Sequence, residues 1–483
     1  MRLTLLTLLT AISMAVFSQE PRVMTLQECV DLAVTNNLNV QRSKLNKDIS
    51  EINLTQSRLS RLPTVNAGGN HVVNWGRGID NNTNQFVNRR FSNTGLNAQS
   101  NVTIYGGMQT NNTIKQNQFN LRASQLDVEK AINDIQVNII TFYLNVIFNQ
   151  ELLQNARFQL ESSQEQLGRT KILVEAGSLP KSNELEIVSQ VSSNEVNVIN
   201  AENSLNFAML TLKQEMLLPT SDLIDVVMPD VEIEQLDLGG TPDKLFLNAE
   251  STQPEIQSAD IRVRSAEYGY KVAQGGLLPT LSATVGVNTN YSDFIKERFV
   301  SDGTFTVVED PLGNPVTSQT FFQTQSGEAV DQLQVLPGGD FEPFGVREQF
   351  KENYAQFAAI NLSIPVFNGY SARSSIQRSK IGIYQAKINA TEQRNFLRQT
   401  IETAHNDAQS AAKTYGAASR QVEALEETFR SIENQYNFGA SNFTDYQVAS
   451  NNLFQAKSDQ TRAKFDFIFK KKLLDFYQGK PIF

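Results

Sequence analysis

The chain has 483 residues, and 42 Lys and Arg against 51 Asp and Glu give a formal net charge of −9. It has one Cys and two His (Cys29, His71 and His405), too few for a zinc cluster, an iron–sulfur site or a disulfide framework, so we expect no cofactor or metal. The negative charge argues against a general nucleic-acid binder. Mean hydropathy is −0.32, and no run of about 18 apolar residues beyond the N-terminus indicates an internal transmembrane helix.

The first 18 residues have the features of a secretory signal peptide. A single Arg2 precedes the apolar run Leu3–Phe17, which is too short to span a membrane, and Gln19 is the expected mature start. The polar segment that follows argues against a buried N-terminal helix. No Cys follows the cleavage point, so we expect no lipid anchor there, and Cys29 is expected to be a small packed side chain.

Most of the remaining chain has the pattern of long helices. Thr25 and Glu28 form a capping box that opens the first of them. Apolar residues then recur at spacings of three and four from about Met108 to Ala176, and again over residues 371–438. At 1.5 Å per residue the first of these helices would be about 100 Å long, which indicates coiled-coil packing.

Four segments instead alternate apolar and polar residues with a period of two, as β-strands do. A strand of this kind with about 9–11 residues has the size of a membrane-spanning barrel strand, whereas the alternative is a half-exposed sheet in a soluble protein. Aromatic residues near the segment ends, together with the signal peptide, favour the membrane interpretation, because aromatic side chains gather at membrane–water interfaces. The segments are Pro63–Trp75, Leu96–Tyr105, Thr280–Tyr291 and Asn353–Ile364, and the interface aromatics are Trp75, Tyr105, Tyr291 and Tyr354.

Four strands cannot close a barrel that hides its edges from lipid, since small membrane barrels need about eight. The strand count therefore predicts that several copies of the chain complete one barrel.

The two halves of the chain repeat the same order of predicted elements. The first repeat covers 19–218, with a helix, a β-hairpin at 63–105 and a long helical hairpin at 108–218. A connector at 219–241 leads to the second repeat at 242–483, with a helix, a β-hairpin at 280–366 and a long helical hairpin at 369–478. Thr241-Pro242 gives the second repeat an N-cap followed by Pro at the first helical position.

The loops between the paired strands differ in length. Residues 76–95 are Asn-rich and short, whereas 292–352 carry eight Phe and four Pro. Barrels carry their longer loops on the outer side. A packed lid over the mouth is the simpler interpretation of 292–352, and a docking role is the alternative.

At this point the chain resembles the TolC-like outer-membrane efflux family over essentially its whole mature length. The resemblance rests on the order of several short features rather than on one motif. They are Thr25-Leu26-Gln27-Glu28-Cys29-Val30-Asp31-Leu32-Ala33, the Leu-Pro-Thr triplets at 62–64 and 278–280, the turns with Gly177 and Gly439, and Tyr436-x-x-Gly439 leading to Asp445.

The resemblance implies a homotrimer whose twelve strands form one outer-membrane barrel, continued by an α-helical coiled-coil tunnel. Such proteins are passive ducts for drugs, small molecules or proteins. They work with a periplasmic adaptor and an inner-membrane transporter of RND or ABC type, or in type I secretion. The polar inner faces of the long helices would then meet water.

The resemblance also implies two functional regions at the periplasmic tips. Adaptor docking is expected at Gly177, Ser178, Leu179, Gly439, Ala440 and Ser441. A periplasmic gate is expected at Asp445, while Ser441 and Val448 stand where the family carries an Arg and a second Asp, and Ser182-Asn183 replaces a Thr-Asp pair. We expect Pro180 and a Thr444-x-x-Gln447 box to start the return helices.

Three other classes of protein fit the sequence less well. An enzyme is disfavoured because neither His has a nucleophile pattern and no Gly-rich phosphate loop precedes a helix. A soluble periplasmic coiled-coil adaptor would not need four alternating strands. A substrate-specific porin would lack the long helices.

Overall fold

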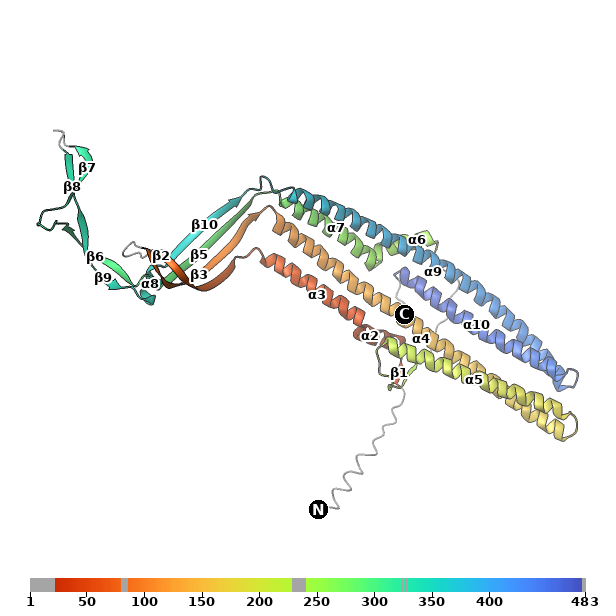
Figure 1. The fold of residues 1–483 in the computed structure, drawn as a ribbon. Helices are drawn as coiled ribbons and strands as arrows, with labels where there is room; N and C mark the ends of the chain where they lie inside the picture. The colour runs from red at the N-terminus through yellow and green to blue at the C-terminus, as the bar shows by residue number, and fades with distance from the viewer. Residues whose placement is uncertain (1–21, 80–85, 228–239, 324, 326–328, 480–483) are drawn as a thin grey trace, which may run out of the picture. The chain divides into compact units, whose positions relative to one another are not determined.

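The computed structural model describes residues 22–79, 86–227, 240–323, 325 and 329–479 (Figure 1). The predicted signal peptide at 1–18 lies outside these ranges, as does most of the connector between the repeats. In the first half the elements are β1 (Arg22–Met24), α2 (Leu26–Asn36), α3 (Leu38–Leu59), β2 (Thr64–Ile79), β3 (Phe86–Gly106), α4 (Gln109–Glu175), α5 (Lys181–Glu215) and β4 (Ile224–Val226).

The second half repeats the four helices and the two sheet strands of the first in the same order. It has no described counterpart of β1 and β4, and it adds four strands and a short helix. Its elements are α6 (Pro242–Thr252), α7 (Pro254–Gly275), β5 (Thr280–Ser292), β6 (Glu297–Val307), β7 (Thr317–Gln323), β8 (Ala329–Leu333), β9 (Val335–Pro343), α8 (Val346–Glu352), β10 (Ala355–Ser363), α9 (Ser371–Asn437) and α10 (Phe443–Tyr477).

Corresponding helices of the two halves have equal lengths. The helices α2 and α6 have 11 residues each, and α3 and α7 have 22. The long helices α4 and α9 have 67 residues each, and the return helices α5 and α10 have 35. The recurrence of apolar residues every three and four positions therefore predicted the first and last residues of α4 and α9 to within one residue.

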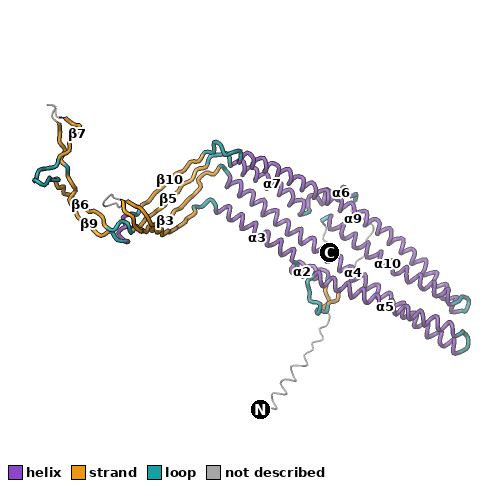
Figure 2. The backbone as a smooth tube through the Cα atoms, viewed as in Figure 1, coloured by secondary structure: helices purple, strands orange, loops and turns teal. Residues whose placement is uncertain are grey.

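The chain forms two compact units, and Figure 2 distinguishes their helices from their strands. A helical unit takes residues 1–56, 112–271 and 374–483. A strand unit takes residues 57–111 and 272–373.

The core of the helical unit joins the short N-terminal helix to the middle of α4. Thr25 caps α2 and exchanges hydrogen bonds with Glu28 as the capping box predicts. Cys29 is fully buried, and burial raises the pKa of its thiol to about 11, so it packs as an apolar side chain. The Tyr143 hydroxyl donates to the carbonyl oxygens of Met24 at 3.2 Å and Val227 at 2.6 Å, which ties β1 and the end of β4 to α4.

Among the described residues, one helix, α4, is long and apolar enough to cross a membrane by length and composition alone. The sequence predicted no such segment, because it has no unbroken apolar run of that length beyond the N-terminus. The central residues of α4, from Ile135 to Ile147, instead carry many of the side chains that the helical core buries.

The strand unit holds a four-stranded antiparallel sheet in the order β10-β5-β3-β2. The first hairpin is longer than predicted, because β2 and β3 extend through 64–79 and 86–106 and pair up to Ile79 and Phe86. The sequence there lacks a clean apolar face, but backbone pairing in a ribbon does not require one. The last strand is shorter than predicted, at 355–363.

The register places the predicted apolar residues on one face and polar residues on the other, since directly opposed residues share a face. A bulge between Thr103 and Tyr105 brings Tyr105 opposite Leu281. The apolar face carries Val65, Ala67, Leu96, Ala98, Val102, Leu281, Ala283, Val285, Val287, Tyr291, Ala358, Ile360 and Leu362. The polar face carries Asn66, Asn70, Asn97, Gln99, Asn101, Thr284, Asn288 and Asn361.

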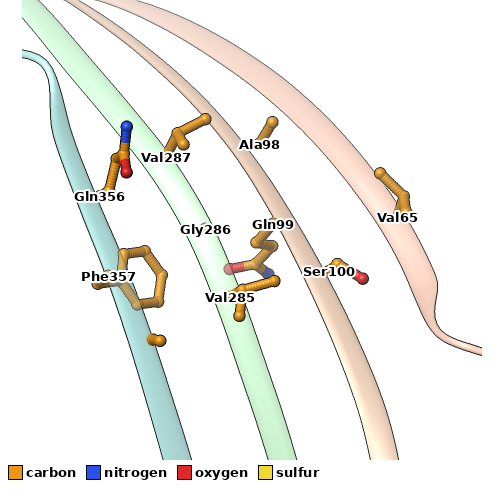
Figure 3. A pocket seen from close by; sticks show the side chains of 10 residues that line it. Val65, Ala98, Gln99, Ser100, Val285, Gly286, Val287, Gln356 and Phe357 are labelled. Atoms are coloured by element: carbon orange, nitrogen blue, oxygen red, sulfur yellow. The ribbon is translucent and has the colours of Figure 1, made fainter.

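Phe357 is an apolar residue on the polar face, as the sequence pattern had already shown, and Val72 and Phe91 lie on the same face. The ring of Phe357 lies over Gly286 on the neighbouring strand, where a Cβ would stand 2.6 Å from the ring (Figure 3). The glycine thus leaves room for the aromatic ring, which covers exposed backbone.

Residues 292–352 are not a simple loop. They hold a two-stranded ribbon of β6 and β9, a second ribbon of β7 and β8, and the short helix α8. The Phe and Pro residues that suggested a packed lid interrupt any long alternation, which is why the short strands were missed.

Candidate functional site

The four-stranded sheet has two open edges and an uncovered apolar face within the described residues. Neither the outer edge of β2 nor that of β10 pairs with another described strand. Apolar side chains on that face stay exposed, including Val65 at 74% and Ile360 at 73%. A sheet with unpaired edges and an open apolar face is incomplete in water, and in lipid its edges would lack hydrogen-bond partners.

The four predicted interface aromatics lie towards the two ends of this sheet. Tyr105 is opposite Leu281, and Tyr291 is opposite Thr94. Trp75, which is 76% exposed, pairs with Arg90, and Tyr354 precedes β10. Tyr291 lies ten residue steps beyond Leu281, which is about 34 Å along a strand at 3.4 Å per residue. This length is comparable to a bilayer core before strand tilt is considered.

Two more apolar side chains, which the sequence pattern did not predict as membrane contacts, follow the last strand of the sheet. Val366 is 93% exposed and Phe367 is 87% exposed, directly after β10. The signal was present, since an apolar pair beside Pro365 in a turn next to a membrane-type strand is a candidate for lipid contact.

A tight turn with two left-handed residues connects strand to long helix in each half. Gly107 and Met108 have φ of 60° and 63° before α4, and Gly369 and Tyr370 have φ of 61° and 67° before α9. A non-glycine residue is uncommon in this conformation, so its recurrence shows that both halves use the same turn.

The predicted tip turns contain helix-ending glycines. Gly177 has φ of 76° and Gly439 has φ of 73°. The Ser178 amide donates to Leu173 O at 2.8 Å, and the Ala440 amide donates to Gln435 O at 2.7 Å. Both ends are therefore Schellman motifs, in which a left-handed residue reverses the chain.

The return helices begin differently from the prediction. Pro180 is the N-cap of α5 rather than its first helical residue. Asn442, not Thr444, caps α10, and its side chain accepts the Asp445 amide at 2.9 Å. The Thr444-x-x-Gln447 box is wrong, because Asn442 offers an equally good cap two residues earlier.

Asp445 is the acidic residue of the first turn of α10, and its side chain is exposed. The Ser441 hydroxyl donates to Asp445 Oδ2 at 3.4 Å. The residue three positions on, Val448, is 53% exposed and carries no charge. Phe438, beside Gly439, is 88% exposed and was not singled out from the sequence.

An aromatic cluster packs the four long helices together near the tips. Tyr446 stacks on Tyr436 with ring centroids 5.1 Å apart and lies 5.5 Å from Phe429. Ile187 of α5 belongs to the same buried cluster, and Leu160 of α4 packs against it.

Polar side chains link the helices of the first half to those of the second half beside this cluster. Gln447 hydrogen-bonds Gln190, and Gln190 donates to Asn451 at 3.3 Å. Gln159 donates to Ser450 at 2.9 Å. The two helical hairpins therefore contact each other through apolar side chains and through hydrogen bonds between polar side chains, most of them amides.

Two long helices carry apolar stripes that no described residue covers. On α3 the stripe includes Leu45, Ile49 and Ile52, which are 63%, 55% and 65% exposed. On α9 it includes Ile381 and Ile388, which are 56% and 57% exposed. Spacings of three, four and seven put each stripe on one helix face.

No group of three or more His, Cys, Asp or Glu that could hold a metal ion occurs within the ranges that the structure describes. His71 hydrogen-bonds Thr94 at 2.8 Å in the sheet, and His405 lies 3.1 Å from Gly240 O in the helical unit.

Comparison with known families matches most of this chain to one of them. The family described as outer membrane efflux protein covers residues 29–216 and 245–467. The chain belongs to this family. Its members are outer-membrane proteins. The match includes the first long helical hairpin, the four strands of the sheet, and the second long hairpin as far as residue 467 of α10.

Individual relatives agree with this family membership. The chain is 20% identical to outer membrane protein TolC of Escherichia coli K12 over 97% of its own length and 84% of that protein. It is 22% identical to nodulation protein T of Rhizobium leguminosarum bv. trifolii over 90% of its length and 81% of that protein.

Solved structures share the fold. The Campylobacter jejuni CmeC outer membrane channel superposes with a TM-score of 0.70 at 15% identity, covering 94% of this chain and 84% of that one. The open state of the Neisseria gonorrhoeae MtrE outer membrane channel gives 0.68 at 16% identity, covering 94% and 88%. The fold is therefore that of a TolC-like channel protein.

Proposed function

We propose that this protein is the outer-membrane exit duct of an export system, a channel rather than an enzyme. Three copies would pair the open edge of β2 in one chain with the open edge of β10 in the next, so that twelve strands close one barrel. The exposed stripes of α3 and α9 would pack between neighbouring copies and continue the barrel as a helical tunnel.

The observation that carries the proposal is the single-layer sheet with an apolar face, a polar face and two unpaired edges. In a closed barrel the apolar face meets lipid and the polar face meets water inside. Membrane aromatics at both ends of the sheet fit the same arrangement.

We assign the duct to a tripartite efflux pump or a type I secretion system, with a periplasmic adaptor that touches both tips. Gly177, Ser178, Leu179, Gly439, Ala440 and Ser441 are the proposed docking residues, and exposed Phe438 adds an apolar contact beside them. Three copies of Asp445 would place three carboxylates around a narrow mouth and favour cations there. Because Ser441 replaces the family's Arg, closure here would depend more on the amide contacts between the helical hairpins than on a charged latch.

Disulfide trapping tests the closure of the barrel. Pairs of cysteines, one on β2 between 66 and 72 and one on β10 between 356 and 361, are introduced into the full chain in outer membranes. At least one of these cysteine pairs should give a covalent three-chain species. The native Cys29 is buried and should not react. Monomer alone in every register, under oxidation that does join β2 to β3 in a control pair at Ala67 and Ala98, would contradict it.

A further inference from the structure

The insertion between β5 and β10 is anchored at its root by one buried amide. The Gln349 side chain is 1% exposed. Its Nε2 lies 3.0 Å from Ser292 O, 2.7 Å from Ile295 O and 2.9 Å from Phe344 O, while Ser292 N–H donates to its Oε1 at 2.8 Å. Both strands of the insertion are therefore held where they leave the sheet.

Charged contacts fix the same root. Asp293 accepts the Ser92 amide at 2.5 Å and the Ser92 hydroxyl at 2.8 Å. Arg298 pairs with Glu352 and, at 3.6 Å, with Glu342. These contacts hold the root of the insertion in place. The ribbon of β6 and β9 extends from this root, and its residues 297–307 and 335–343 are here named the distal ribbon.

One face of the distal ribbon is apolar and uncovered. The register pairs Phe299 with Phe341, Phe305 with Pro337, and Val307 with Val335, and directly opposed residues share a face. The rings of Phe299 and Phe341 meet edge to face at 5.5 Å. Phe305 is 71% exposed and Phe341 is 57% exposed.

An isolated two-stranded ribbon is marginally stable in water, and it becomes stable when it gains further strands or packs its apolar face on something. Neither outer edge of the distal ribbon pairs with another described strand. The distal ribbon is therefore expected to gain stability when a second molecule covers its apolar face or pairs with one of its edges.

The charge of the segment that contains the distal ribbon indicates what kind of partner could bind to it. Between Arg298 and Arg347 the sequence has no Lys or Arg, and its acidic residues are Asp302, Glu309, Asp310, Glu328, Asp331, Asp340 and Glu342. Like charges oppose packing of this segment against another copy of itself, and they oppose binding to an anionic lipid headgroup.

We propose that the distal ribbon is a docking surface for a basic protein, which adds a strand or an apolar face to it at the outer mouth of the duct. Only the extracellular position rests on the proposed function. The apolar face supplies the buried area, and the acidic residues on and beside the ribbon, among them Asp302, Glu309 and Asp340, favour a positively charged partner.

The test uses the purified full-length protein in detergent and a fluorescent synthetic hairpin peptide of alternating Val and Lys as the probe. Anisotropy should show saturable binding that weakens with salt. The same peptide with Glu in place of Lys should not bind. The double substitution Phe299→Ser/Phe341→Ser should weaken binding about tenfold or more, because central apolar contacts dominate such interfaces.

A second variant avoids any loss of ribbon structure. Asp340→Lys/Glu309→Lys leaves the apolar face intact and should weaken binding and flatten its salt dependence. The control Leu312→Ser changes a side chain that is 86% exposed but lies outside the paired strands, and it should bind as the unchanged protein does.

Several results would overturn the proposal. They are equal binding of the Glu peptide, no saturable binding, or binding of lipopolysaccharide micelles that competes with the Lys peptide. Disulfide-linked copies through Phe305→Cys would show instead that the ribbon packs on itself. Failure of the barrel to form three-chain species would count against the proposed function alone, because peptide binding is measured independently.

Discussion

Asp445 is the residue on which the proposed gate depends most directly. Its charge lies at the N-terminal end of α10, where the helix dipole favours a carboxylate, and the side chain is exposed. The substitution Asp445→Asn should lower the cation-over-anion permeability of the reconstituted channel by about twofold or more, because rings of carboxylates set selectivity at narrow mouths.

Reversal potentials in a salt gradient measure this selectivity. Asp459→Asn is the matched control, because Asp459 is an exposed carboxylate on the same helix that accepts hydrogen bonds from Gln455. Equal shifts in both variants would refute a special role for Asp445.

Gln349 should be the critical residue of the insertion root. Gln349→Leu removes a hydrogen-bond partner from the Ser292 amide and from the carbonyl oxygens of Ser292, Ile295 and Phe344. Each buried polar group left unsatisfied in this way costs about 1–3 kcal/mol. Hydrogen exchange at Ser292 and its neighbours should accelerate. Gln334→Leu, at an exposed position between β8 and β9, should leave those amides protected, and equal acceleration in the two variants would contradict the assignment.

Asp293 should make the same root sensitive to acid. Hydrogen bonds from Ser92, its backbone amide first, hold the pKa of this carboxyl below its usual range. A lowered folded-state pKa gives stability that is present above the unfolded value, near pH 4, and is lost as pH falls towards the folded value.

Local opening at Ser92, from hydrogen exchange corrected for intrinsic rates, should therefore increase below about pH 4. Asp293→Asn keeps an acceptor but removes the charge, so its opening should be independent of pH in that range. Parallel pH profiles for the two proteins would show that the carboxylate is not responsible.

At the scale of elements, the strand-to-helix turns offer a matched pair of positions. Gly107 and Gly369 have nearly the same φ, but a Cβ at Gly107 would clash with the Gly275 carbonyl oxygen and stand 3.0 Å from Leu278 Cβ, whereas Gly369 has open space. Gly369→Ala should cost only the left-handed strain, about 1–2 kcal/mol.

Gly107→Ala should lower the free energy of unfolding by clearly more than Gly369→Ala does, because the backbone at Gly275 must also move to make room for the new Cβ. Thermal unfolding of the detergent-solubilised protein compares the two variants directly. Equal losses of stability would mean that the contact between Gly107 and Gly275 does not constrain the fold.

The sequence predicted most of these elements because their periodicity is strong. The two long helices and the apolar positions of the sheet follow from repeats of 3.6 and 2. The tip turns follow from Gly177 and Gly439. The extension of β2 and β3 and the strands within 292–352 were missed, because ribbons held by backbone pairing need no regular alternation.

The cap of α10 shows a second limit of sequence reasoning. Asn442 and Thr444 are both good N-caps, and only the backbone geometry distinguishes them. Likewise, the sequence contains Val366, Phe367 and Phe438, but their exposure depends on what the tertiary structure leaves uncovered.

At the scale of the whole molecule, a single chain leaves strand edges unpaired and apolar surfaces uncovered among its described residues. It carries a sheet with two unpaired edges, and it carries apolar stripes on α3 and α9. Both features call for copies of the same chain, and the closure of a barrel by three chains accounts for both at once.

The mass of the protein extracted by detergent from purified outer membranes tests this account most directly. Light scattering corrected for bound detergent should give three chains, each close to 53.9 kDa less its signal peptide. A single chain recovered in the soluble fraction would mean that the four strands form an ordinary half-exposed sheet, and the proposed duct would be wrong.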